Sequence, residues 1–226
     1  MQSARVRCRF APVLFAAVIT LLAGCGGGSN PSSNAGKTIT VAPLDNNVQP
    51  ITINIGPANN YNNGVYTSVT LCVPGTATCQ TVDNVLVDTG SSGLRLISSA
   101  LTIALPQQSG RAECTQFQDG FVWGPLATAD VKISGEQALS ATVQLAGVSG
   151  FAGVPKACSD SGGKEMDTAQ SLGANGVLGI SVFRQDCGGA CASSGASNPG
   201  FYYSCAGGNC GKTAVGLAQQ VQNPVA

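Results

Sequence analysis

The sequence predicts an all-β, mainly antiparallel fold with few short helices, stapled by disulfides. Several runs alternate apolar and polar residues, which is the period of a half-buried strand. The 30 glycines and 11 prolines recur along the chain, and long apolar stretches with the 3.6-residue period of a helix are absent. Ten cysteines in a chain that begins like an exported protein are typical of a disulfide framework.

Residues 1–24 are predicted to be a lipoprotein signal peptide. An arginine-rich start precedes an apolar run, Phe10 to Ala23, that is too short to be a comfortable membrane span. The run leads into Leu22-Ala23-Gly24-Cys25, which resembles a bacterial lipobox and implies cleavage before Cys25 and acylation of its thiol and amine. The alternative is an ordinary signal peptide followed by a chance cysteine.

Cys25 is therefore the predicted lipidation site, and membrane lipid is the predicted partner of its acyl chains. The next residue, Gly26, is not the aspartate of the usual inner-membrane retention signal. We expect an anchor in the outer membrane, with the chain on the periplasmic side or at the cell surface. Residues 25–36 are rich in Gly, Ser and Asn and are predicted to be a flexible tether.

Composition excludes several classes of function. Charged residues make up 10% of the chain and the net charge is zero, so no basic field exists to attract nucleic acid. The chain has no histidine, which excludes Ser-His-Asp and Cys-His catalysis and most zinc sites. We therefore predict no cofactor and no metal, and the oligomeric state stays open.

The cysteines suggest a pairing. Setting aside Cys8 in the signal peptide and Cys25 leaves 10 − 2 = 8, an even number. Local spacing predicts a staple across the turn Pro74-Gly75, pairing within the Gly-rich segment, and one remaining bond by elimination: Cys72 with Cys79; Cys187, Cys191, Cys205 and Cys210 among themselves; Cys114 with Cys158. A metal site in the second group is the alternative, although its spacing does not match paired C-x-x-C knuckles.

Residues 37–185 are predicted to form one lobe. In chain order the pattern predicts strands at 65–73 and 80–88, a short helix at 98–105, a hairpin of 129–133 with 142–145, and a helical turn at 168–172. Residues 186–226 turn to Gly, Ser, Ala and Cys. We expect this segment to be a disulfide-stapled insertion or long loop, followed by the start of a continuation that the chain truncates.

The strongest chemical signal is the run Val-Leu-Val-Asp-Thr-Gly-Ser-Ser at residues 85–92. Three β-prone apolar residues lead to Asp88, and a glycine-bearing turn with two hydroxyl residues follows it. This pattern is typical of a strand that ends by presenting one carboxylate in a fixed, hydrogen-bonded pose.

Three motifs resemble the pepsin-like aspartic peptidases, in the order that this family uses. Residues 85–94 are similar to its catalytic loop. The family's flap over the substrate is similar to Phe121-Val122-Trp123-Gly124 with the hairpin that follows. The strand that threads its catalytic loop is similar to Asn-Gly-Val-Leu-Gly-Ile at residues 175–180. The resemblance covers about residues 50–185 and implies a single pepsin-like (acid-protease) lobe.

The resemblance implies that Asp88 is the catalytic carboxylate. Ser91 would hydrogen-bond its outer oxygen, Thr89 would buttress the loop from inside, and Gly90 would allow close approach of the backbone. In the family two such carboxylates share one proton, and they act as base on a water and as acid on the peptide carbonyl.

Trp123 and Gly124 would contact the substrate, because they stand at the flap of the resembling family. Trp123 replaces the usual tyrosine there and keeps an N–H donor on a large ring. The implied partner is a polypeptide substrate or ligand. The chain is also similar to an uncharacterised family of bacterial lipoproteins with a lipobox, the Asp-Thr-Gly-Ser-Ser-Gly-Leu-Arg motif and a Cys/Gly-rich stretch.

The second aspartate of the family is not evident. Asp160 lies in an Asp-Ser-Gly without an apolar strand before it, as in a solvated loop, and Asp167 suits the start of a helix. Arg95 stands where the family usually has an aromatic residue. Near Asp88 it would favour the ionised carboxylate; as a surface side chain, the favoured interpretation, it would point away.

Three hypotheses follow. The chain is an endopeptidase-like lobe whose second lobe is absent, or a lobe that receives a second Asp88 from a twin subunit. The third is an inactive binding or structural lipoprotein that keeps the loop as a rigid fold element.

Overall fold

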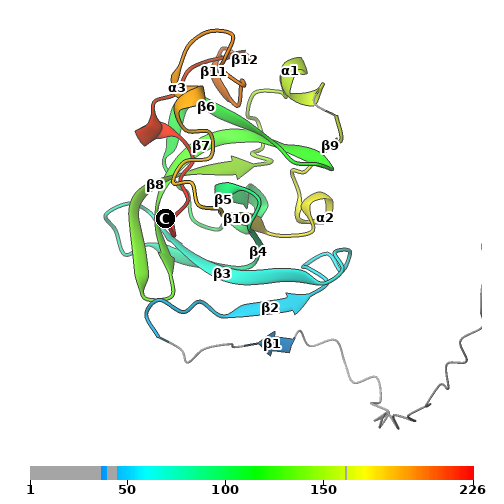
Figure 1. The fold of residues 1–226 in the computed structure, drawn as a ribbon, viewed down its shortest axis with the longest axis vertical. Helices are drawn as coiled ribbons and strands as arrows, with labels where there is room; N and C mark the ends of the chain where they lie inside the picture. The colour runs from blue at the N-terminus through cyan, green and yellow to red at the C-terminus, as the bar shows by residue number, and fades with distance from the viewer. Residues whose placement is uncertain (1–36, 40–44, 161) are drawn as a thin grey trace, which may run out of the picture. The chain divides into compact units, whose positions relative to one another are not determined.

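The computed structural model describes residues 37–39, 45–160 and 162–226 (Figure 1). The predicted signal peptide, tether and lipidation site at Cys25 lie outside these residues. Within the described part of the chain, no helix combines the length and the apolar character that a bilayer crossing requires.

The described chain is mostly β-structure, as the sequence predicts. The strands are β1 (Lys37–Ile39), β2 (Ile51–Asn54), β3 (Gly64–Cys72), β4 (Cys79–Asp88), β5 (Ser92–Ile97), β6 (Gln107–Gln116), β7 (Gly120–Ile133), β8 (Glu136–Ala146), β9 (Lys164–Glu165), β10 (Gly176–Ile180), β11 (Tyr202–Ala206) and β12 (Asn209–Lys212). The helical segments are short: η1 (Ser98–Ala100), α1 (Lys156–Ser159), α2 (Ala169–Leu172), α3 (Gly189–Ala192) and η2 (Leu217–Gln219).

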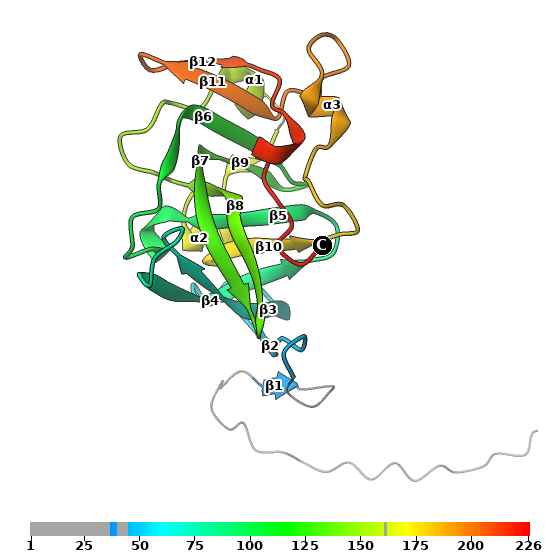
Figure 2. The same cartoon turned by 90° about the vertical axis from the view of Figure 1, so that its left-hand side faces the viewer.

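Six strands form a closed ring (Figures 1 and 2). Strand β3 pairs with β4, β4 with β10, β10 with β5, β5 with β8 and β8 with β7, which returns to β3. Most pairs of the sheet are antiparallel, whereas β4–β10, β5–β8 and β7–β9 are parallel. Closure gives each of these strands a neighbour on both sides, so the ring exposes few unpaired backbone groups.

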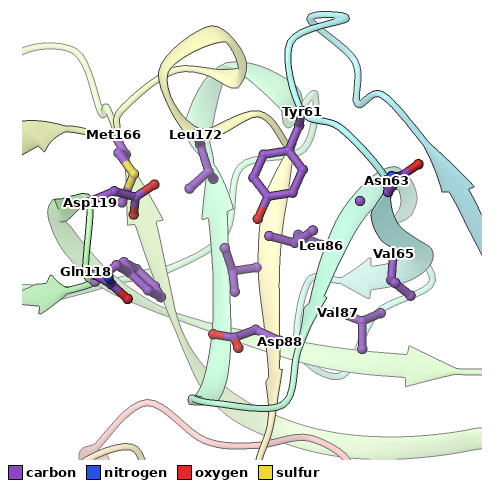
Figure 3. A pocket seen from close by; sticks show the side chains of 13 residues that line it. Tyr61, Asn63, Val65, Leu86, Val87, Asp88, Gln118, Asp119, Met166 and Leu172 are labelled. Carbon is purple, nitrogen blue, oxygen red and sulfur yellow. The ribbon is translucent and has the colours of Figure 1, made fainter.

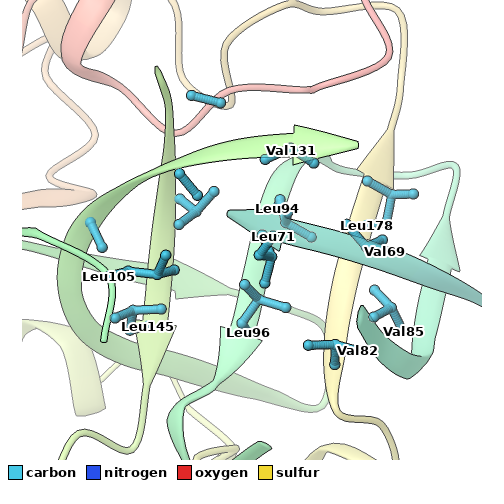
Figure 4. Close-up of a cluster of buried hydrophobic side chains, with 14 of the residues drawn as sticks. Val69, Leu71, Val82, Val85, Leu94, Leu96, Leu105, Val131, Leu145 and Leu178 are labelled. Carbon is cyan, nitrogen blue, oxygen red and sulfur yellow. The ribbon is translucent and has the colours of Figure 1, made fainter. Parts of the chain in front are cut away.

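The main core fills this ring (Figure 4). Val69 and Leu71 of β3 and Leu94 and Leu96 of β5 are fully buried there. Each buried aliphatic side chain stabilises the fold by about 1.5–3 kcal/mol. The period-2 pattern of the predicted strands 65–73, 80–88 and the 129–145 hairpin is therefore confirmed, because these strands line one core.

Residues 186–226, the Cys/Gly-rich segment, contain regular structure that their composition did not predict. Strand β11 pairs with β6 and with β12, so the segment extends the sheet beyond β6. Tyr202, Val215 and Val221 pack against Leu126 of β7. The expected long loop is therefore partly a hairpin, which the sequence hides because Gly, Ser and Cys carry little apolar alternation.

The predicted disulfides are confirmed. Cys72–Cys79 joins β3 to β4, and Cys114–Cys158 joins β6 to α1. Within the Cys/Gly-rich segment the pairs are Cys187–Cys191 and Cys205–Cys210. The alternative of a metal site on these four thiols is excluded, since disulfide sulfurs are not thiolate ligands.

The two predicted helices differ in outcome. The turn at 168–172 is α2, and Thr168 caps it by accepting a hydrogen bond from the Ser171 N–H. The helix predicted at 98–105 is limited to η1, because Leu101 is extended. The Gln80 side chain accepts hydrogen bonds from the Thr102 backbone N–H and hydroxyl, which holds the chain in that conformation.

Candidate active site

The loop after β4 holds the carboxylate of Asp88 at both oxygens. The Gly90 backbone N–H donates to Oδ1 at 2.8 Å, and the Ser91 hydroxyl donates to Oδ2 at 2.6 Å. Hydrogen bonds to an ionised acceptor are among the stronger ones in proteins. The pose expected for Asp88 and the role expected for Ser91 thus match the geometry.

Strand β10 passes close behind this loop. It pairs in parallel with β4, with Gly179 opposite Asp88, and the Ser181 N–H donates to the Ser91 carbonyl at 2.9 Å. A Cβ on Gly179 would lie 2.7 Å from the Ser91 hydroxyl oxygen and 2.8 Å from its carbonyl. Only glycine lets the strand approach the loop this closely.

Asp88 lies in a pocket of about 470 Å³ (Figure 3). Its wall is largely apolar, and its rim carries polar side chains. The side chains around Asp88 come from the loop before β3, from β4 and β10, from the β6–β7 turn and from the chain around α2: Tyr61, Leu86, Phe117, Gln118, Asp119, Met166, Leu172 and Val177. Such a lining suits a segment of polypeptide with apolar side chains.

The β6–β7 turn faces Asp88 across this pocket (Figure 3). Phe117, Gln118 and Asp119 form the turn, and the Phe117 N–H donates to the Gly120 carbonyl at 2.8 Å. Sequence reasoning missed these residues and Tyr61. The pair Asp119-Gly120 between two strands is a hairpin-turn signal that could have located the turn.

Trp123 and Gly124 are not brought together with Asp88. Both lie inside β7 and line a different pocket, beside Phe151. Trp123 is 4% exposed, and its ring N–H donates to the Ala152 carbonyl at 2.8 Å. The Trp123 N–H, which we expected to contact substrate, is therefore engaged within the protein. The tip of the β6–β7 hairpin lies earlier in the chain, at residues 117–119.

Thr89 lies on the outer side of its loop. Its side chain is exposed, so it does not buttress the loop from inside as the resemblance implies. The loop is held instead by Ser91 and by Ser92, whose hydroxyl contacts the Ser181 hydroxyl and donates to the Phe183 carbonyl.

Arg95 is buried, contrary to the favoured expectation of a surface side chain. Its side chain is 2% exposed and pairs with Glu113 and Asp186 at 2.9 Å each. Because the register of β5 turns Arg95 away from the ring core, these carboxyls rather than Asp88 neutralise it. The expected effect of Arg95 on Asp88 is therefore not supported by a contact.

The other aspartates considered as partners lie elsewhere. Asp160 is exposed at the end of α1 and pairs with Lys156 at 2.7 Å. Asp167 lies before α2 and lines the pocket of Trp123. Within the described residues no group of three or more His, Cys, Asp or Glu could hold a metal ion.

Comparison with known proteins gives a family without an assigned activity. No curated protein matches the chain. Residues 43–226 match the family model described as "Protein of unknown function (DUF3443)", which covers most of the chain. The chain therefore belongs to the DUF3443 family.

Proposed function

We propose that this chain is an aspartic-peptidase-like lobe that binds extended polypeptide over Asp88 and supplies one of the two carboxylates of an endopeptidase site. The observation that carries the proposal is the carboxylate of Asp88, held by Gly90 and Ser91 at the pocket that the β6–β7 turn faces. A pepsin-like lobe is part of this proposal, and the buried passage of Gly179 behind the loop supports it.

The chemistry needs a second carboxyl group. Asp88 would take a proton from a water as general base, and a protonated partner would donate to the peptide carbonyl. Two carboxyl groups that lie close enough to act on the same peptide bond hold one proton between them, because both cannot ionise at once. Asp119 lines the same pocket but is exposed on the turn, so we assign it no catalytic role.

Binding and hydrolysis are tested separately. A fluorescent extended peptide with apolar side chains, and the same peptide with a secondary hydroxyl in place of one carbonyl, are titrated onto the purified chain. We expect the hydroxyl peptide to bind more tightly, because it resembles the tetrahedral intermediate, and Asp88→Asn to remove this difference. Asp160→Asn is the control, since Asp160 is exposed and outside the pocket. Equal binding of both peptides to the unmodified chain would refute the proposal.

Hydrolysis is measured with an unfolded protein at mildly acidic pH. The described residues place one hydrogen-bonded aspartate in the pocket, so we expect little turnover by this chain alone. The same observation favours a second candidate function, a catalytically inactive binding or structural lipoprotein. Cleavage that disappears in Asp88→Asn and persists in Asp160→Asn would exclude that candidate.

We also propose that the lobe is anchored in the outer membrane through acylated Cys25, on the periplasmic side or at the cell surface. The lipobox-like Leu-Ala-Gly-Cys and the tether after it support the proposal. Metabolic labelling with a fatty acid should mark the unmodified protein and not Cys25→Ser, which should move to the soluble fraction. Cys8→Ser is the control, and unlabelled unmodified protein would contradict the proposal.

A further inference from the structure

A cluster of charged side chains is buried beside the loop that carries Asp88. Arg95 on β5, Glu113 on β6 and Asp186 after β10 have side-chain exposures of 2%, 0% and 3%. Nη2 of Arg95 donates to Oε1 of Glu113 and to Oδ2 of Asp186, each at 2.9 Å. The two acidic side chains thus meet at one nitrogen.

The charges of the cluster balance only if one carboxyl is protonated. Two ionised carboxylates against one guanidinium would leave a net negative charge in the interior, which is costly. Burial opposes the charge of Arg95, but Glu113 and Asp186 outweigh this effect and raise its pKa, so Arg95 stays charged. The remaining titratable group is Tyr202 of β11; burial, and then both carboxyls, raise its pKa, so it stays neutral.

The hydrogen bonds indicate where the proton lies. Asp186 accepts a hydrogen bond at each oxygen, from Arg95 and from the Tyr202 hydroxyl at 2.6 Å, so both of its oxygens already have a donor. Oε2 of Glu113 is buried and has no partner among the described residues. A proton there removes the excess charge and provides a donor toward Asp186. Burial raises the pKa of Glu113 well above its usual value of 4.5; Arg95 opposes this shift, and Asp186 adds to it.

Asp186 is also where the Cys/Gly-rich segment joins the lobe. Its backbone N–H donates to the Val221 carbonyl, and the Val221 N–H donates to the Tyr202 hydroxyl at 2.7 Å. On the other side, Nη1 of Arg95 donates to the Ser92 carbonyl at 2.8 Å, one residue after the serine that holds Asp88. A change of charge in the cluster therefore reaches both the segment and the loop.

We infer that Glu113 and Asp186 share one proton in the folded protein, and that this pair is a pH-sensitive latch. The latch holds residues 186–223 on the lobe at acidic pH and loosens as Glu113 ionises, because two adjacent carboxylates then repel each other. Thr115 and Gln144, the other polar side chains around Arg95 and Glu113, are neutral and cannot replace the lost proton.

Infrared spectroscopy of the intact protein tests the shared proton. Above about pH 5, where exposed carboxyls are mostly ionised, we expect the unmodified protein to keep the carbonyl-stretch band of a protonated carboxyl and to lose it at higher pH as Glu113 ionises. The band should be absent in Glu113→Gln. Glu165→Gln is the matched control, because partial burial raises the pKa of Glu165 outside this cluster. A band that is absent, or that Glu165→Gln removes and Glu113→Gln does not, overturns the inference.

Amide hydrogen exchange tests the latch. In the unmodified protein we expect the protection factors of residues 186–223 to fall as the pH rises. The fall is at most about tenfold per pH unit, which is the limit for one linked proton. In Glu113→Gln, which is neutral at every pH, they should stay constant. The same pH dependence in both proteins overturns the latch. If Glu113→Gln does not fold, exchange in the unmodified and Glu165→Gln proteins decides: pH-independent protection in both overturns it.

Discussion

Asp88 and Glu113 are both carboxylic acids, but they lie in different surroundings. Asp88 is half-buried and accepts one hydrogen bond at each carboxylate oxygen. Glu113 is fully buried, shares its cation with Asp186, and has a pKa raised first by burial. The sequence around Asp88 predicts its pose because the hydrogen-bond donors are its neighbours in the chain. The partners of Glu113 lie 18 and 73 residues away, so its state could not be predicted from the sequence.

Glu113 should make the stability of the protein depend on pH. Its folded pKa lies above the unfolded value near 4.5, so its favourable contribution is complete below about pH 4.5 and is lost as the pH rises toward the folded pKa. As the pH increases, the free energy of unfolding should therefore fall in the unmodified protein relative to that of Glu113→Gln. Denaturant midpoints between about pH 4 and pH 8 measure this. A difference that stays constant with pH would contradict the prediction.

The position of strand β10 could not be predicted from its own sequence motif. Its sequence, Gly-Val-Leu-Gly-Ile, indicates a buried strand, but the structure adds that it lies between β4 and β5 and supports the Asp88 loop. The hairpin of β6 and β7 shows the opposite case. Strand β7 begins at Gly120, so residues 121–124 lie within the strand and the turn at 117–119 faces the pocket.

Replacing Gly179 by alanine should damage the loop. The new Cβ would lie within 2.8 Å of Ser91 atoms, and overpacking of this kind costs about 1–3 kcal/mol. We expect Gly179→Ala to lower the unfolding midpoint and to weaken binding of the hydroxyl peptide. The matched control is Gly211→Ala in β12, where a Cβ would meet nothing within 4 Å, and whose midpoint should change little. Equal effects of the two substitutions would show that the close approach is not important.

The molecule as a whole is held by a closed ring of strands, with the Cys/Gly-rich segment packed beyond β6 (Figures 1 and 2). The ring has its own apolar core, whereas the segment has a small cluster, two local disulfides and the buried charges that meet at Asp186. Opening of the segment should therefore precede unfolding of the ring.

The disulfides should differ in their effect on stability. Cys114–Cys158 closes a loop with a sequence separation of 44, and Cys187–Cys191 one of 4. On loop-closure entropy, removing the first bond costs about 4 kcal/mol and the second about 2 kcal/mol. Paired Cys-to-Ala variants, compared by denaturant midpoint, measure this difference. A larger loss for the Cys187–Cys191 variant would contradict the chain-entropy argument.

The sequence was sufficient to predict the class of the fold, the Cys72–Cys79 disulfide and the pose of Asp88. Each depends on short-range patterns: period-2 alternation, cysteines close in the chain, and donors within three residues of a carboxylate. Three other features became visible only in the folded chain: the turn that faces Asp88, the hydrogen bond that engages Trp123 elsewhere, and the burial of Arg95 between two acids. These features depend on strand register and on contacts between distant segments, and no local pattern encodes either.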